Sequence, residues 1–163
     1  MKAATLFALL LIPAALSARG FEAPGLAAKW TTSEPPINLL HIDYGEINRH
    51  GEAVGYHHRL NGEDPPGARV ERIVQPPDAS GVYRARVAVR DPMTGMWIDK
   101  KGPSTFFPDV MSDDEVISAV LAAFQAGHRR GDGQFMGASG HGFAIEGWYQ
   151  NGRINAAYPL CGP

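Results

Sequence analysis

The chain has 163 residues, a formal charge of −2 at neutral pH and one cysteine, Cys161. This length suits one domain built around a single hydrophobic core. The slightly negative charge excludes the overall basic field that is typical of nonspecific nucleic-acid binders. One cysteine excludes an intramolecular disulfide, so the fold must be held together by packing.

Residues 1–18 have the pattern of a secretory signal peptide. Lys2 is followed by an uncharged run over residues 3–18 that ends in the small residues AALSA, where a signal peptidase would cut. The run contains Pro13 and is shorter than the roughly 20 apolar residues of a membrane span, although an uncleaved anchor is the alternative. We therefore expect a secreted or periplasmic protein with no stable membrane association after cleavage, an extended segment over residues 19–36 and a folded domain over residues 37–163.

Residues 81–91 predict a half-buried strand, because apolar and arginine side chains alternate along them. The apolar face holds Tyr83, Ala85, Val87 and Val89, and the polar face holds Arg84, Arg86 and Arg90. Residues 96–100 follow after a short turn and complete a predicted hairpin.

A helix is predicted over residues 112–128. Ser112 and Glu115 have the spacing of a capping box, and Asp113 and Asp114 suit the positive end of a helix dipole. An apolar stripe follows at helical spacing, formed by Val116, Val120, Leu121 and Phe124. Gly127 is expected to end the helix.

The last segment predicts a second hairpin around Asn151-Gly152, a strong two-residue turn signal. Pairing across this turn would place Tyr158 opposite Ile145 and Ala156 opposite Gly147. Strands and helix are segregated along the chain rather than alternating, so the predicted class is α+β with antiparallel sheet and a few packed helices.

Three kinds of side chain form a candidate catalytic set. His41 and His57 stand sixteen residues apart, Lys100 and Lys101 follow later, and Tyr158 lies near the end. Two imidazoles can split a phosphodiester without a metal, since one takes a proton, the other gives one, and a cation stabilises the phosphorane.

Three stretches carry a family resemblance: HIDYGEINRHGEAVGYHHR, DPMTGMWIDKKGPSTFFPD and IEGWYQNGRINAAYP. Together, over residues 38–160, they resemble the bacterial EndoU nuclease family, whose members include toxin domains. The resemblance implies that His57 is the general base and His41 the general acid, and the reverse order would leave the reaction class unchanged. The motif of the first histidine includes Gly45 and Glu46.

The resemblance also implies a catalytic lysine and base-contacting hydroxyls. A viral relative has its lysine four residues before a uracil-contacting serine, and this spacing fits both Lys100 with Ser104 and Lys101 with Thr105. Only one lysine at a strand end should face the cleft, and we slightly favour Lys101. Ser104 and Thr105 are expected to bind a base edge and give a uridine preference, although capping a turn is their alternative role.

Tyr158 matches the family tyrosine that positions the substrate and can stack on a base. Many relatives place threonine two residues before this tyrosine, where this chain has Ala156. The change removes a potential base contact and leaves the proton-transfer groups in place.

His58 is expected to be a neighbour of the site rather than part of it, because adjacent residues of a strand face opposite sides. No metal or other cofactor is expected, since the aspartates Asp99, Asp109, Asp113 and Asp114 do not combine with histidine at a recognised ligand spacing. Some relatives depend on manganese, and the sequence leaves that dependence open.

Basic residues suggest where a polyanion would lie. Arg84, Arg86 and Arg90 on the strand face could extend a basic surface toward RNA, but a solvated strand face is the commoner situation. Arg129 and Arg130, with the two lysines, are a second candidate for a local basic patch.

The sequence thus predicts a secreted, metal-independent endoribonuclease that leaves 2′,3′-cyclic phosphate and 5′-hydroxyl ends. Its substrate would be RNA, its role that of a toxin or an RNA scavenger, and its protein partner a cognate immunity or inhibitor protein. The alternative is a catalytically inactive RNA- or protein-binding module on the same fold, motivated by Ala156 and the negative charge. A more remote alternative is a metal-assisted phosphodiesterase that uses His57 and His58 together.

Overall fold

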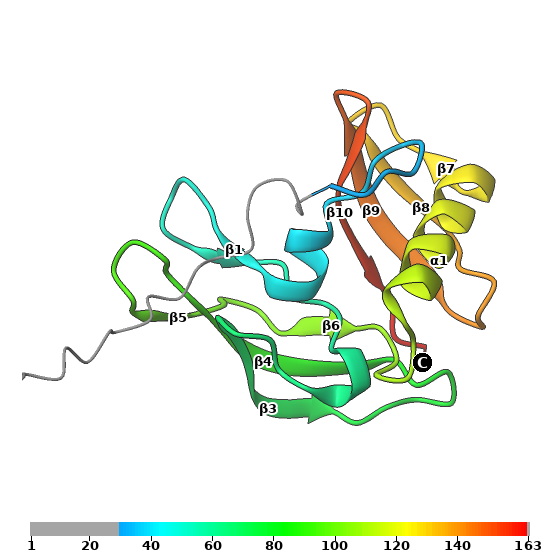
Figure 1. Ribbon diagram of the computed structural model, residues 1–163. Helices are drawn as coiled ribbons and strands as arrows, with labels where there is room; N and C mark the ends of the chain where they lie inside the picture. Colours follow the sequence, from blue (N-terminus) through cyan, green and yellow to red (C-terminus); the bar gives the residue numbers. More distant parts are fainter. Residues whose placement is uncertain (1–29, 163) are drawn as a thin grey trace, which may run out of the picture.

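Figure 1 shows the computed structural model of the protein, in which residues 30–162 are described. The predicted signal peptide lies outside these residues, as does most of the predicted extended segment. The described end of that segment contacts the folded domain, since Trp30 bridges to Asn38 and Ile154 N donates to Pro36 O. No helix within residues 30–162 is long and apolar enough to cross a membrane.

The first sheet forms from the middle of the chain around β4 (Tyr83–Arg90), the predicted half-buried strand. Its neighbours are β3 (Ala68–Gln75) and β5 (Trp97–Asp99), while β6 (Ser104–Phe106) also pairs with β4. All these pairings are antiparallel, and the predicted hairpin of β4 with β5 is confirmed. The sequence did not predict β3 or β6 as strands.

The inner face of the first sheet packs on the segment that precedes it. Alternate residues of β4 are buried against Tyr56 and Phe106, whose rings meet edge to face at 5.1 Å between centroids. The buried members of this cluster are Ala53, Tyr56, Ala68, Tyr83, Ala85, Val87, Val89 and Phe106. The arginines of β4 consequently point to the opposite, outer face.

The second sheet forms from the end of the chain and is covered on one face by α1 (Asp113–Ala126) (Figure 1). Its strand order is β10-β9-β8-β7, all antiparallel. The bounds are β7 His128–Arg129, β8 Gln134–Ala138, β9 Ala144–Gln150 and β10 Arg153–Pro159. With two antiparallel sheets and one main helix, the predicted α+β class is confirmed.

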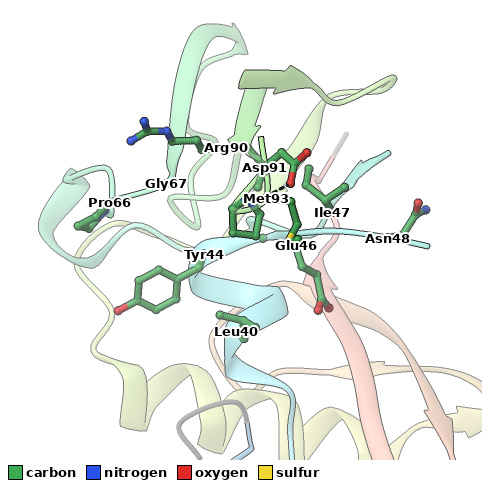
Figure 2. Close-up of a pocket in the computed structure, with 13 residues that line it drawn as sticks. Leu40, Tyr44, Glu46, Ile47, Asn48, Pro66, Gly67, Arg90, Asp91 and Met93 are labelled. Carbon is green, nitrogen blue, oxygen red and sulfur yellow. Dashed lines mark hydrogen bonds between the residues drawn. The ribbon is translucent and has the colours of Figure 1, made fainter. Parts of the chain in front are cut away.

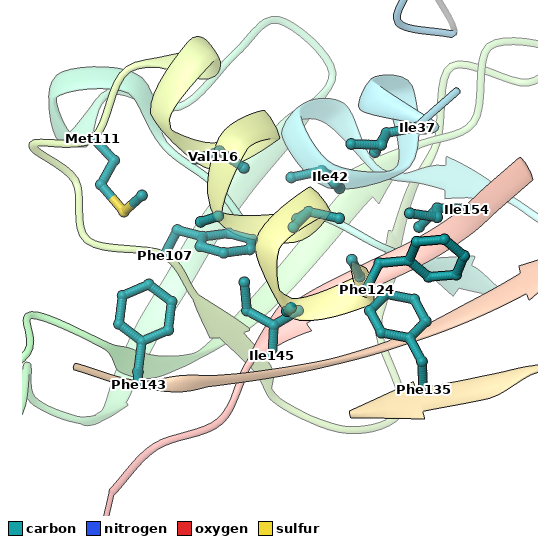
Figure 3. Close-up of a cluster of buried hydrophobic side chains, with 14 of the residues drawn as sticks. Ile37, Ile42, Phe107, Met111, Val116, Phe124, Phe135, Phe143, Ile145 and Ile154 are labelled. Atoms are coloured by element: carbon teal, nitrogen blue, oxygen red, sulfur yellow. The ribbon is translucent and has the colours of Figure 1, made fainter. Parts of the chain in front are cut away.

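The helix α1 follows its sequence signals closely. Ser112 is the N-cap, its hydroxyl accepts from Glu115 N, and the capping box is complete. Gly127 is the C-cap. The predicted apolar stripe packs onto the second sheet, where Phe124 meets Phe135 edge to face at 5.3 Å between centroids (Figure 3).

The hairpin of β9 and β10 is confirmed, but its register differs from the prediction. Tyr158 lies opposite Glu146 instead of Ile145, and Ala156 lies opposite Trp148 instead of Gly147. A bulge between Ile154 and Ala156 adds one residue, which the turn signal cannot reveal. The bulge lets Ile154 and Ala157 both face the core although they are three residues apart.

Residues 40–62 precede both sheets in the chain and contact each of them, and we call them the connecting segment. They contain a short π-helical turn, η2 (Leu40–Tyr44), a two-residue strand pair of β1 (Glu46–Ile47) with β2 (Ala53–Val54), and the 3₁₀ turn η3 (Leu60–Gly62). The period of the sequence here was too ambiguous to assign. Both candidate catalytic histidines lie in this connecting segment.

Candidate active site

A cleft of about 410 Å³ lies where this connecting segment meets both sheets. It brings together His41, His57, one lysine and Tyr158, four of the residues that the sequence singled out. The lining residues are His41, Val54, Gly55, His57, Lys100, Pro103, Thr105, Trp148, Ala156 and Tyr158.

Backbone hydrogen bonds bring the two histidines together. Tyr56 N donates to His41 O at 2.8 Å, and His57 N donates to Ile42 O at 2.6 Å. Gly55 has a φ of +77° and approaches so closely that an added Cβ would lie 2.3 Å from His41 O. Only glycine fits this crossing, which leaves the His41 and His57 rings 5.8 Å apart between centroids.

His57 is a neutral imidazole with a defined tautomer. Its Nδ1 lies 2.8 Å from Thr105 O on β6, and a carbonyl only accepts, so Nδ1 carries the proton and Nε2 presents a lone pair. Burial, with the nearby charges of Lys100 and His41, lowers the pKa of His57 well below its usual value, against the opposing effect of the Thr105 hydrogen bond. A ring in this state can accept a proton at neutral pH.

His41 is oriented by a carboxylate. Its Nδ1 lies 3.1 Å from Glu46 Oε1, so Nδ1 donates and Nε2 is left for the cleft. Asn38 Nδ2 donates to the same oxygen at 3.2 Å, which holds the carboxylate in place. The sequence placed Glu46 in the first motif but did not predict this contact.

The lysine in the cleft is Lys100, so the preference for Lys101 was wrong. Asp99, the last residue of β5, pairs with Ala88 on the outer face, and alternation turns Lys100 inward. Lys101 is 84% exposed at its side chain and pairs with Glu52. Lys100 Nζ donates to Gly55 O at 3.0 Å and to Ser104 Oγ at 2.8 Å, leaving one of its three N–H groups for the cleft.

The structure separates the two hydroxyls that were expected to bind a base. Ser104 is wholly buried, and its Oγ accepts from Lys100 while donating to Gly55 O at 3.1 Å. Its hydroxyl therefore positions the lysine and does not line the cleft. Thr105 does line the cleft, where its carbonyl contacts the His57 ring, and its side chain lies on the same side of the sheet as that of Arg84, its Cα partner.

Tyr158 lies over His57, with the two rings stacked at 5.2 Å between centroids. Its hydroxyl donates to Glu146 Oε1 at 2.8 Å, an oxygen that also accepts from Gln134 Nε2. The bulge in β10 makes this contact by setting Tyr158 opposite Glu146. Trp148 lies 6.0 Å from Tyr158 between ring centroids and lines the same cleft. Sequence reasoning missed it, and its place beside the cleft depends on the bulge.

His58 faces the opposite side from His57, as expected. Its Nδ1 lies 3.0 Å from Asp43 Oδ1 and 3.6 Å from Asp113 Oδ1, and its Nε2 lies 2.9 Å from Met111 O. Burial alone would lower the pKa of His58, but its hydrogen bonds to Asp43 and Met111 and the charges of Asp43 and Asp113 together raise it. Both ring nitrogens face acceptors, an arrangement that suits an imidazolium, and the ring ties η2 to the start of α1.

Within residues 30–162, Asp43, His58 and Asp113 are the group that could hold a metal ion, with ligand atoms within 4.8 Å of one another. They line a pocket that shares no residue with the cleft, so a cation there would not touch the cleft's side chains. His57 and His58 thus do not combine into one site.

Another pocket, of about 420 Å³, lies between η2, β1 and the turn after β4 (Figure 2). Its walls are mostly apolar, with Leu40, Tyr44 and Met93 among them. No histidine or lysine lines it. Glu46 and Asp91 supply its carboxylates, but the paired imidazoles and the ammonium lie in the cleft, which is therefore the candidate active site.

A fold of two antiparallel sheets with two imidazoles, an ammonium and a phenol in the cleft between them defines a nuclease-type site. The family model of the bacterial EndoU nuclease matches residues 38–161, and the chain belongs to this family. The resemblance inferred from the three motifs is confirmed.

A relative from Bacillus cereus, named Toxin, is 32% identical over 126 residues. The match covers 76% of this chain but 22% of that protein, so the chain spans about a fifth of the relative's length. No solved structure matches the chain.

Proposed function

We propose that the protein is an endoribonuclease that cleaves RNA by transphosphorylation. The observation that carries this proposal is the state of His57: a neutral ring, fixed by Thr105 O, with its Nε2 lone pair in a cleft that also holds His41 and Lys100. In RNA the 2′-hydroxyl is a nucleophile next to the scissile phosphate, and it needs a base of this kind.

The proton transfers follow from the two ring orientations. His57 Nε2 takes the proton of the 2′-hydroxyl, and the 2′-oxygen attacks phosphorus. His41, held by Glu46, gives a proton to the 5′-oxygen as the phosphorus–oxygen bond breaks. The products are a 2′,3′-cyclic phosphate and a 5′-hydroxyl, and no metal is required by these steps.

Lys100 supplies the positive charge for the phosphorane. Two of its N–H groups are held by Gly55 and Ser104, so the ammonium is positioned before substrate arrives. Burial lowers the pKa of Lys100 to about 8, and the group is still charged at neutral pH.

The aromatic side chains and Thr105 support base recognition. Tyr158 and Trp148 offer ring faces on which bases can stack, and such stacking tolerates any base. The Thr105 hydroxyl can donate or accept, which suits the edge of a uracil. We propose a uridine preference that is weakened by Ala156, which brings a methyl group to the cleft where many relatives have a hydroxyl.

The biological setting that we favour is that of a secreted toxin with a cognate immunity protein. The toxin relative supports this role, and the signal-like pattern of residues 1–18 supports export. Scavenging of extracellular RNA is the second candidate role for the same activity.

The test is incubation of the protein with a uridine-containing RNA in EDTA, followed by analysis of the product ends. Cyclic-phosphate ends that disappear in His41→Ala, His57→Ala and Lys100→Ala would support the proposal. Lys101→Ala is the matched control and should cleave like the wild type, because Lys101 points to solvent.

A failure to cleave would favour the inactive binding module. RNA binding without cleavage, with or without added manganese, would overturn the endoribonuclease. Cleavage that requires manganese would overturn the metal-independent mechanism and leave the nuclease.

A further inference from the structure

The outer face of the first sheet carries an unusual concentration of arginine. Arg84, Arg86 and Arg90 of β4 project there, and the strand register adds Arg72 opposite Arg86 and Arg69 opposite Ala88. All five side chains are exposed. The face has two carboxylates, Glu71 and Asp99, whereas the whole chain has a net charge of −2. The basic charge is therefore concentrated on one side.

Two of these arginines are direct cross-strand neighbours. Arg72 and Arg86 are Cα partners, and like charges in this position repel and destabilise the strand pair. Arg69 forms an ion pair with Glu71, whereas among residues 30–162 no carboxylate forms an ion pair with Arg72, Arg84, Arg86 or Arg90. A simple solvated face would balance charges of both signs, whereas this face has five arginines and two carboxylates. This arrangement leaves the guanidinium groups available to an external polyanion.

The arginine row begins at the rim of the cleft. Arg84 is the Cα partner of Thr105, so the two side chains project on the same side of the sheet, and Thr105 lines the cleft. Arg86 Nη1 donates to Lys101 O at 3.1 Å, in the turn that follows Lys100. A depression continues along the same face, and Lys100 lines both this depression and the cleft. The lining residues of the depression are Arg69, Glu71, Arg86, Val87, Asp99 and Lys100. The row is thus continuous with the cleft.

We propose that this face, defined by Arg69, Arg72, Arg84 and Arg86, binds the phosphates of the RNA strand beyond the scissile bond. The inference rests on the proposed endoribonuclease function and adds the path of its substrate. Guanidinium groups suit the role because their planar fork can donate two parallel hydrogen bonds to one phosphate. A local track of this kind explains how a chain of net negative charge engages RNA.

The test compares two double variants that remove the same charge. Arg84→Gln with Arg86→Gln changes the track, whereas Arg49→Gln with Arg153→Gln changes exposed arginines elsewhere, in the turn after β1 and at the start of β10. Binding is measured by fluorescence anisotropy at several salt concentrations with a twelve-nucleotide RNA whose 2′-hydroxyls are all methylated. This probe cannot be cleaved, because its nucleophile is blocked. Cleavage of a uridine-containing dinucleotide is measured in parallel.

The track variant should bind the twelve-nucleotide RNA about tenfold more weakly, and the slope of log affinity against log salt should fall by about 1.4, about 0.7 for each lost contact. The control should bind like the wild type, and all three proteins should cleave the dinucleotide equally. Equal affinity and equal slope for both double variants would overturn the track and favour an acidic protein as the partner of this face. Binding that depends on Arg84 and Arg86 in a protein that cleaves no RNA would keep the track and overturn the ribonuclease.

Discussion

His57 and His58 are neighbours in the chain but lie in opposite electrostatic environments. His57 faces the cleft, where burial, together with the charges of Lys100 and His41, holds its pKa low. His58 faces the pocket of Asp43 and Asp113, whose charges and hydrogen bonds hold its pKa high despite burial. Two consecutive residues thus supply a neutral ring suited to proton transfer and a charged ring suited to holding the fold. Burial lowers the pKa of both rings, and at His58 the hydrogen bonds to Asp43 and Met111, with the charges of Asp43 and Asp113, reverse that effect.

The largest expected effect comes from His57→Ala. Loss of the base should lower the rate of RNA cleavage by about 10²–10⁴-fold, the usual contribution of a positioned proton acceptor. Single-turnover cleavage measures the rate, and the unfolding midpoint in urea serves as the control for folding. A variant that retains more than a tenth of the wild-type rate while folded would place the base elsewhere.

His58→Ala should have the opposite signature. Removing the imidazolium leaves Asp43 and Met111 O without their partner, and losing one member of a buried pair costs about 3 kcal/mol of unfolding free energy. The cleavage rate of the folded fraction should stay within a few fold of the wild type. Urea unfolding measures the stability, and cleavage at low temperature measures the rate. A large loss of cleavage rate with normal stability would contradict the structural role of His58.

The contribution of His58 to stability should depend on pH. Its pKa is raised by folding, so its contribution is full below the unfolded value of about 6.5 and is lost as the pH rises through the higher folded value. The difference in unfolding free energy between wild type and His58→Gln should therefore shrink toward alkaline pH, by at most about 1.4 kcal/mol per pH unit. If the difference in unfolding free energy grows with pH, His58 is not a charged imidazolium in the folded protein.

Lys100→Arg tests the cation on the cleft side. The Lys100 pKa of about 8 means that its charge is present below that pH and lost above it. The wild-type rate should fall about fivefold between pH 8 and pH 9, whereas the arginine variant should show no such fall. The measurement is the pH dependence of kcat. If kcat falls equally in both proteins above pH 8, the titration of a group other than Lys100 causes the fall.

The smallest expected effect comes from Ala156→Thr. The added hydroxyl faces the cleft and offers one hydrogen bond, worth about 1 kcal/mol, to a bound base. The ratio of kcat/KM for uridine over cytidine dinucleotides should rise about fivefold, with the histidine-dependent chemistry unchanged. An unaltered ratio would show that position 156 does not contact the base.

Local signals in the sequence predicted much of the fold. The capping box at Ser112, the alternation in β4 and the Asn151-Gly152 turn all act within a few residues, and the structure has each of them. The bulge in β10 and the strands β3 and β6 depend on packing against distant segments, and no local pattern indicated them.

The sequence predicted which residues form the candidate site, but not how their side chains are arranged. The motifs identified His41, His57 and Tyr158, and the structure brings them into one cleft. The choice of Lys100 over Lys101 depends on where β5 ends, and the burial of Ser104 depends on how β6 pairs. The partners Glu46 and Glu146 act through side chains that only the folded chain brings close.

The most direct test of the account is a pH titration of the ring nitrogens of His57 and His58 by NMR of the protein with ¹⁵N-labelled histidine. At pH 7, His57 should be neutral with its proton on Nδ1, while His58 should carry protons on both nitrogens. His57 should stay neutral well below pH 6.5, where an unperturbed histidine is half protonated. A His57 that is charged at pH 7, or a His58 that is neutral there, would contradict the assignment of base and structural cation.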